Sequence, residues 1–305
     1  PETSWSGCEH LNENLLLYAN WTQKTFVDYI EALKNDQTSD TVVIKDAKTL
    51  QAFRDYVEHC KENNIDTTND RFALGADIVL EDNWTRGIDG FEGIFDGNGH
   101  TVTYADAGAS IFETVKGTVK NINVAGRGSM SGGIARTLDG GSIEGCTIKS
   151  GTVLNSDDII GGIVGTILNK EFNSGKILEC RIESGVTISG GNFVGGIAGQ
   201  VSGSDGTPVI ENCSVGAATI KGAGSRPAEP DGNGGGKGGL GGILGYGAGR
   251  LSDCMSDALI EAEGSEVYGI GGIVGVKGST QGKLEVERCG FTGTIKAEGK
   301  ADSVG

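Results

Sequence analysis

The sequence lacks several features that would place it in common functional classes. It contains no run of 18 apolar residues, so we expect no segment that inserts into a membrane. The net charge of −16 argues against nucleic acid and anionic membrane surfaces as partners, because both repel an acidic protein. With only 4 prolines the chain is not a proline-rich linker, and an aromatic content of 6% disfavours a groove that stacks sugars.

Glycine, by contrast, is abundant, with 54 residues placed in a recurring phrase. The segment Gly-Gly-Ile-small-Gly occurs five times, although the first copy ends in Arg136 instead of glycine. Spacings of this order indicate stacked repeats rather than one globular core. We interpret the diglycines as structural residues of tight corners, at Gly132, Gly161, Gly195, Gly241 and Gly271.

A second phrase, apolar-x-x-Cys, recurs with the first. Its cysteines are expected to stack inside the fold as a structural core ladder, and an upstream copy has isoleucine in the same slot, which marks a packing position. Equivalent positions on neighbouring coils lie about 5 Å apart with parallel side chains, which does not suit a disulfide. The predicted ladder is Ile122, Cys146, Cys180, Cys213, Cys254 and Cys289. The pairing state of Cys8 and Cys60, which lie outside it, stays open.

These periodicities predict an all-β solenoid, a right-handed parallel β-helix with three strands per coil, preceded by a small α/β cap. In Ile177-Leu-Glu-Cys180 a bend must return both end residues to one interior, which is the geometry of a polygonal coil. We divide the chain into residues 1–23, a remnant of a preceding module, 24–70, a capping segment with a helix after Asp46, and 71–305, the β-helix. Its last residues resemble the approach to a new repeat, so we expect further repeats or domains on both sides.

The glycine phrases, together with Phe91-Glu-Gly-Ile-Phe-Asp-Gly-Asn-Gly-His-Thr-Val102, resemble the GLUG-motif proteins over about residues 75–305. Leu17-Tyr-Ala-Asn-Trp-Thr22 also resembles the closing strand of a Listeria–Bacteroides repeat. The resemblance implies an extracellular bacterial protein, secreted or attached to the cell surface. The GLUG repeat also accompanies immunoglobulin A peptidases, but their zinc chemistry does not carry over because the chain has no His-Glu-x-x-His segment.

Candidate chemistry is sparse. Adjacent carboxylates at Asp157 and Asp158, and Asp231 in the insert of residues 222–239, are the loop candidates for binding, catalysis or calcium. Asp96, Asn98 and His100 have the composition of an ion site, but an Asp-Gly-Asn-Gly turn accounts for the aspartate and asparagine without a ligand. We therefore predict no catalytic residues, no metal and no cofactor.

The favoured function is a non-catalytic extracellular module, an adhesive surface or stalk that presents its faces to a host protein or glycan. The alternative is a carbohydrate-active β-helix of the polysaccharide lyase or hydrolase type, in which carboxylates would converge in one groove. A structural spacer without any ligand is the third possibility.

Overall fold

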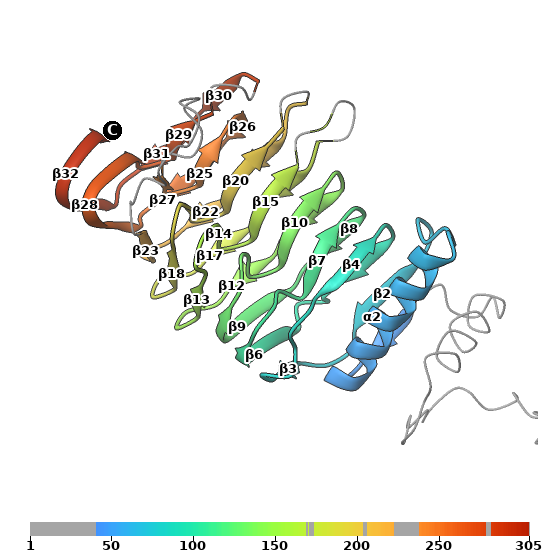
Figure 1. The fold of residues 1–305 in the computed structure, drawn as a ribbon. Coiled ribbons are helices and arrows are strands. Elements are labelled where there is room, and N and C mark those ends of the chain that lie inside the picture. The colour runs from blue at the N-terminus through green and yellow to red at the C-terminus, as the bar shows by residue number, and fades with distance from the viewer. Residues whose placement is uncertain are drawn as a thin grey trace, which may run out of the picture.

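The computed structural model describes residues 41–168, 170, 174–203, 206–222, 238–278 and 282–304, without the side chains of 264–268 and 298–304. Several predicted features lie outside these residues: the segment 1–23 with Cys8, residues 24–40 of the cap, and almost all of the 222–239 insert with Asp231. The described part is an elongated stack of coils with a helix across its N-terminal end (Figure 1). The predicted parallel β-helix is thereby confirmed, whereas nothing tests the predicted domain boundaries.

Three sheets run along the stack, and their strands pair in parallel, each with its equivalent one coil away. Sheet 1 contains β1 (Val42–Ile44), β2 (Arg71–Leu74), β5 (Ile94–Asp96), β8 (Thr118–Lys120), β11 (Ser142–Glu144), β16 (Lys176–Leu178), β21 (Val209–Glu211), β26 (Gly249–Ser252) and β30 (Leu284–Glu287). Sheet 2 contains β4 (Ile88–Phe91), β7 (Phe112–Val115), β10 (Ala135–Asp139), β15 (Val164–Leu168), β20 (Ala198–Ser202), β25 (Leu244–Gly247) and β29 (Val274–Lys277).

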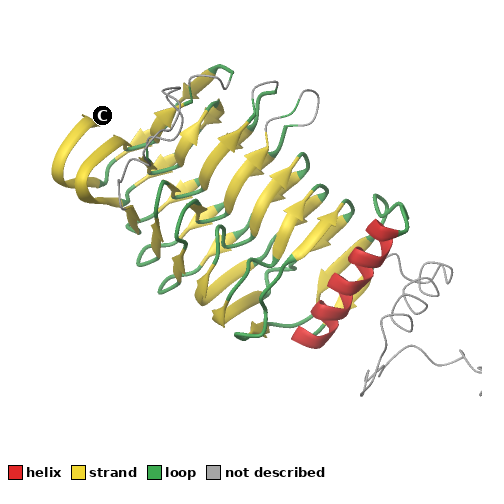
Figure 2. Ribbon diagram, viewed as in Figure 1, coloured by secondary structure: helices red, strands yellow, loops and turns green. Residues whose placement is uncertain are grey.

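Sheet 3 is the largest, because several of its short strands lie in each coil (Figure 2). It contains β3 (Ile78–Leu80), β6 (Thr101–Ala107), β9 (Asn123–Ser129), β12 (Thr147–Ile148), β13 (Val153–Asn155), β14 (Ile160–Gly161), β17 (Arg181–Ile182), β18 (Thr187–Gly190), β19 (Phe193–Gly195), β22 (Ser214–Val215), β23 (Thr219–Gly222), β24 (Gly239–Gly241), β27 (Met255–Ser256), β28 (Leu259–Gly271), β31 (Gly290–Phe291) and β32 (Thr294–Val304).

The interior is built of stacked identical side chains. On sheet 1, Ile143 pairs with Ile177, which pairs with Ile210, and all three are at most 1% exposed. Burying one such side chain contributes about 1.5–3 kcal/mol before entropy is counted. Because the same residue type recurs at the same level of each coil, the core continues along the stack without a break.

The diglycine phrase forms the corner between sheets 3 and 2. A Cβ on Gly196 would lie 2.2 Å from the carbonyl oxygen of Gly242 on the next coil, and Gly162 meets Gly196 in the same way at 2.3 Å. The carbonyl oxygen of Gly196 also accepts an inter-coil hydrogen bond from the amide of Gly162 at 3.1 Å. The glycines are therefore needed for close backbone approach between coils.

A second corner joins sheets 1 and 3 immediately before the cysteine slot. The residue preceding each member of the ladder has a left-handed backbone, at Asn121, Gly145, Glu179, Asn212, Asp253 and Arg288, with φ between 52° and 58°. Glu179 thus provides the bend that the spacing of Ile177 and Cys180 requires. Non-glycine residues rarely adopt this conformation, so the turn is imposed by the stack rather than by local preference.

Helix α2 (Ala47–Glu62) closes the N-terminal end of the stack. As predicted, Asp46 caps it: its carboxylate accepts from the amide of Thr49 at 2.7 Å. Phe53 on the buried face packs against Phe72, Phe91 and Phe95, with ring centroids 4.1, 5.2 and 5.5 Å away. No described helix combines the length and apolar character that a bilayer crossing requires.

Candidate functional site at the capped end

The predicted cysteine ladder lies in the interior. Cys146, Cys180, Cys213 and Cys254 are buried free thiols, and Ile122 occupies the same column on an earlier coil. The Sγ of Cys180 lies 3.4 Å from the carbonyl oxygen of Leu178 and 3.6 Å from that of Ile143 one coil back. Burial raises the pKa of Cys180 well above its ordinary value, so this thiol stays protonated and unreactive.

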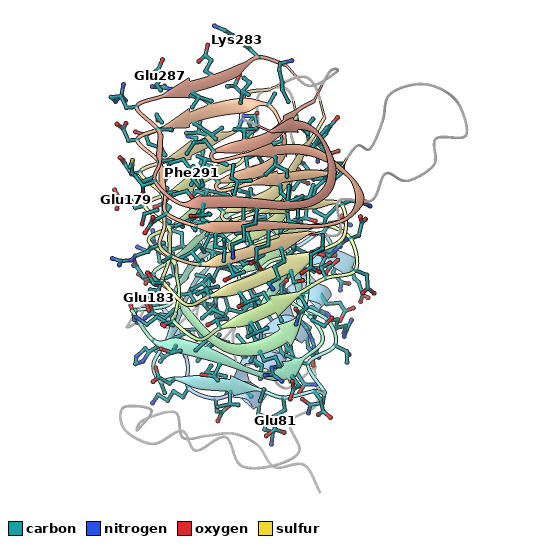
Figure 3. The ribbon with its side chains drawn as sticks, turned by 90° about the vertical axis from the view of Figure 1, so that its left-hand side faces the viewer. Glu81, Glu179, Glu183, Lys283, Glu287 and Phe291 are labelled. Carbon is teal, nitrogen blue, oxygen red and sulfur yellow. The ribbon has the colours of Figure 1, made fainter. Side chains whose placement is uncertain are left out.

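The fifth cysteine differs from its equivalents. Cys289 is only half-buried, because its coil is the last one described and has no described neighbour on its outer side. Figure 3 shows this end of the stack, with Phe291 of the same coil labelled. We expected every cysteine of the ladder to be buried, and the half-buried Cys289 corrects this expectation.

The acidic loop candidates do not converge. Asp157 and Asp158 are exposed, and the Asp158 carboxylate accepts from the side-chain amide of Asn192 on the next coil at 2.5 Å. The main-chain oxygen of Asp158 also accepts from the amides of Gly191 and Asn192, both at 2.9 Å. Other acids do not gather there either, as Figure 3 shows with Glu81 and Glu287 near opposite ends of the stack. Asp158 therefore has a structural role, because its contacts with Gly191 and Asn192 stabilise the turn against the next coil.

The Asp-Gly-Asn-Gly-His turn is likewise held together by the protein itself. Asp96 accepts from the Asn98 amide at 2.9 Å and from the side chain of Asn121 at 3.0 Å. His100 Nδ1 lies 3.2 Å from Asp77, whose carboxylate also accepts from the amide of Thr101. Within the described part of the chain, no group of three or more His, Cys, Asp and Glu residues is arranged to hold a metal.

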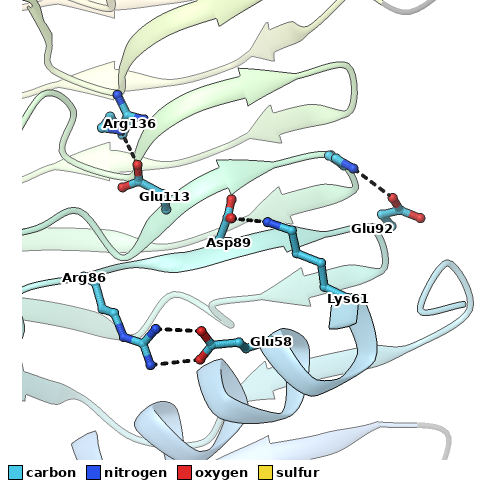
Figure 4. A network of polar contacts seen from close by, with 8 residues as sticks. Glu58, Lys61, Arg86, Asp89, Glu92, Glu113 and Arg136 are labelled. Carbon is cyan, nitrogen blue, oxygen red and sulfur yellow. Dashed lines mark hydrogen bonds and ion pairs between the residues drawn. The ribbon is translucent and has the colours of Figure 1, made fainter. Parts of the chain in front are cut away.

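A set of polar side chains that the sequence did not indicate lies where α2 meets sheet 2 (Figure 4). Arg86 donates to both oxygens of Glu58 at 2.8 Å, and Lys61 pairs with Asp89. Farther along the sheet Lys116 pairs with Glu92 at 3.3 Å, and Arg136 pairs with Glu113. We call these eight residues the cap network.

Two hollows flank Lys61 in this network. One of about 350 Å³ lies toward the C-terminal end of α2 and is bounded by Lys61, Asn64, Glu92 and Lys116. The other, of about 320 Å³, is bounded by Glu58, Lys61, Arg86 and Asp89. Both are at the small end of the range for ligand pockets, and charges of both signs line them.

Electrostatic interactions favour the ionised form of two carboxylates of the cap network, Glu58 and Asp89. Hydrogen bonding from Arg86 lowers the pKa of Glu58. Partial burial opposes ionisation of Asp89, but the Lys61 ammonium and Thr114 outweigh it, so the pKa of Asp89 is also lowered. Neither acid is therefore prepared to donate a proton near neutral pH. The arrangement suits the binding of a polar partner by exchange of ion pairs and hydrogen bonds.

Sequence reasoning missed this site because its partners are distant in sequence. Glu58 and Arg86 are 28 residues apart, as are Lys61 and Asp89. The only available signal was Arg136, which replaces glycine in the first copy of the repeat phrase. Its side chain lies on the outer face of sheet 2, where it pairs with Glu113.

Comparison with known proteins identifies the fold but no family. No protein-family model matches this chain, and neither does the sequence of any curated protein. Among solved structures, it is similar to the crystal structure of a candidate immunoglobulin A1 protease from Bacteroides ovatus. The TM-score is 0.64 at 22% sequence identity, over 86% of this chain and 79% of that chain. The fold and this comparison therefore place the chain among β-helical proteins, with a fold similar to that structure over most of its length.

This likeness corrects one expectation. The sequence favoured a non-catalytic extracellular module, whereas a protein with the same fold over most of its length carries the name of a protease. The exclusion of an enzymatic role is therefore wrong.

Proposed function

We propose that this chain is the substrate-engaging β-helix of an extracellular bacterial protein of the immunoglobulin A1 protease type. It belongs with the GLUG-repeat proteins, and its adhesive surface faces a host protein outside the cell. The cap network is the part of that surface that makes the specific contacts.

The fold likeness carries the proposal, because it extends over 86% of this chain. The repeat phrases, which resemble those of GLUG-motif surface proteins, add support from the sequence. The cap network adds a reason from chemistry: paired charges beside two hollows give an acidic protein a local surface of mixed sign. Such patterns give specificity and steer association more than they add to affinity.

The test uses the purified chain and immunoglobulin A1 as the probe. We expect saturable binding by biolayer interferometry that weakens as salt is raised, because exposed ion pairs are screened. Electrophoresis of the same mixture reports cleavage: new fragments would assign proteolysis to this chain, and binding without fragments would assign it substrate engagement. Neither binding nor fragments would refute the proposal and favour a structural spacer.

A variant in which the two residues of an ion pair are exchanged tests whether the cap network is the binding surface. The double variant Lys116→Glu/Glu92→Lys keeps an ion pair at the edge of the hollow but reverses its direction, so binding should fall. The matched control is Lys149→Glu/Glu183→Lys, a pair 2.9 Å apart that follows strands β12 and β17 and lines neither hollow. Equal effects of the two exchanges would refute the assignment to the cap network.

A further inference from the structure

A third cavity, of about 310 Å³, opens on sheet 3, away from the cap network. Strands β6 and β9 provide most of its walls, and the turn before β13 closes one side. It is lined by Tyr104, Ala105, Asp106, Gly126, Arg127, Gly151 and Val153.

The cavity exists because the regular stacking is interrupted here. The register between β6 and β9 shifts between Ala105 and Ala107, which leaves Asp106 outside the ladder with a φ of 59°. Opposite the bulge, Gly126 has a φ of 90°, and a Cβ there would lie 2.1 Å from the carbonyl oxygen of Tyr104. A bulge at the surface of a sheet re-aims side chains, and in this case it turns Asp106 out of the repeat pattern.

The floor of the cavity is fixed. Tyr104 is buried, and its hydroxyl donates to the carbonyl oxygen of Gly133 and accepts from the amide of Ile111, both at 2.9 Å. The ring therefore cannot swing out to fill the space.

The cavity contains two opposite charges that do not neutralise each other. Arg127 and Asp106 are both exposed and both line it, yet Arg127 forms no ion pair within 4.0 Å among the described residues. By contrast, Arg86 pairs closely with Glu58, and Arg288 pairs closely with Asp253. An exposed guanidinium and an exposed carboxylate that line one hollow without pairing form a bipolar site.

We propose that this cavity binds one carboxylate-bearing sugar unit. The Arg127 guanidinium pairs with the sugar carboxylate through two parallel hydrogen bonds, which is the geometry that arginine favours. Asp106 accepts hydrogen bonds from ring hydroxyls on the opposite side. A volume of about 310 Å³ is at the small end for ligand sites and suits one ring rather than a chain of them. This site is independent of immunoglobulin binding.

The experiment titrates the chain with glucuronate and follows amide and arginine Nε signals by NMR. Glucuronate should shift the signals of Gly126, Arg127 and Gly151, whereas glucose, which lacks the carboxylate, should bind at least about tenfold more weakly. A second titration uses the free amino acid alanine, a zwitterion without a sugar ring. If free alanine bound as tightly as glucuronate, the sugar assignment would be overturned.

Two variants assign the roles. Arg127→Gln should weaken glucuronate binding at least about tenfold, because the charge-assisted pair is lost. Asp106→Asn should weaken it less, since asparagine keeps a hydrogen-bond acceptor and tolerates the left-handed backbone. The control is Arg181→Gln on β17 of the same sheet, which should change nothing. Unchanged affinity in Arg127→Gln, or no saturable shift with glucuronate, would overturn the proposal.

Discussion

The second glycine of each repeat phrase offers the sharpest test of how the coils stack. In Gly196→Ala the new methyl group would lie 2.2 Å from the oxygen of Gly242 and 2.8 Å from Val215 Cγ2, far inside contact distance. Overpacking of this kind costs about 1–3 kcal/mol.

The matched control is Gly108→Ala. Its nearest neighbour would be 3.8 Å away and its backbone is not left-handed, so we expect no loss and a gain of up to about 1 kcal/mol from the unfolded state. Thermal unfolding measured by circular dichroism compares the two variants. At about 2–4 °C per kcal/mol, Gly196→Ala should unfold several degrees below the parent chain. Equal melting temperatures for the two variants would refute the conclusion that close contact between coils requires glycine at position 196.

Three other outcomes are expected. Thiol titration of the native chain should find Cys289 reacting first, because the other four cysteines of the ladder are buried. Titration in denaturant without reductant should find at least the five ladder cysteines as reactive thiols, and two or fewer would contradict the ladder. Glu179→Asn should raise the melting temperature, corresponding to up to about 1 kcal/mol, because asparagine tolerates a φ of 56° better. The Arg288 guanidinium lowers the pKa of Asp253 below 3.8, so its contribution to stability is present above that pH and is lost as the pH falls through the folded-state pKa. Asp253→Asn should therefore flatten the acid limb of a melting-temperature profile, and an unchanged limb would contradict the pair.

The repeat columns could be predicted from the sequence because identical coils repeat one environment. Cysteine and isoleucine share a slot, so the slot had to be a packing position, and Ile177 and Cys180 required a bend. The sequence did not show that Glu179 adopts the left-handed conformation, because glutamate has no preference for it. The bend is determined by the neighbouring coils, which restrict this corner to one path.

The two candidate binding regions escaped prediction for a different physical reason. The cap network joins a helix to loops and strands of the first coils, and its pairs depend on how α2 docks, which no spacing records. The cavity at Arg127 depends on a one-residue register shift, which changes the direction of Asp106 without any motif. The low aromatic fraction was informative only for sugar stacking, and an ionic sugar site does not require an aromatic ring.

Both regions involve the first coils, although they lie on different sheets, and this gives the repeat array a division of roles. The bulge of β6, the exposed Arg136 and the docking of α2 all lie in the first coils, where the repeat pattern is broken. In the next coils the pattern is regular. Strands β15 and β20 pair without a register shift, and glycine occupies the position equivalent to Arg136 in the repeat phrase. A repeated position serves stacking, since a change there is felt by the coils on both sides. Substitutions of the exposed binding residues in the early coils should therefore alter ligand binding at nearly constant stability, whereas those at repeated positions in later coils should lower stability and leave binding intact. A binding defect from Gly196→Ala in the folded chain would contradict this division.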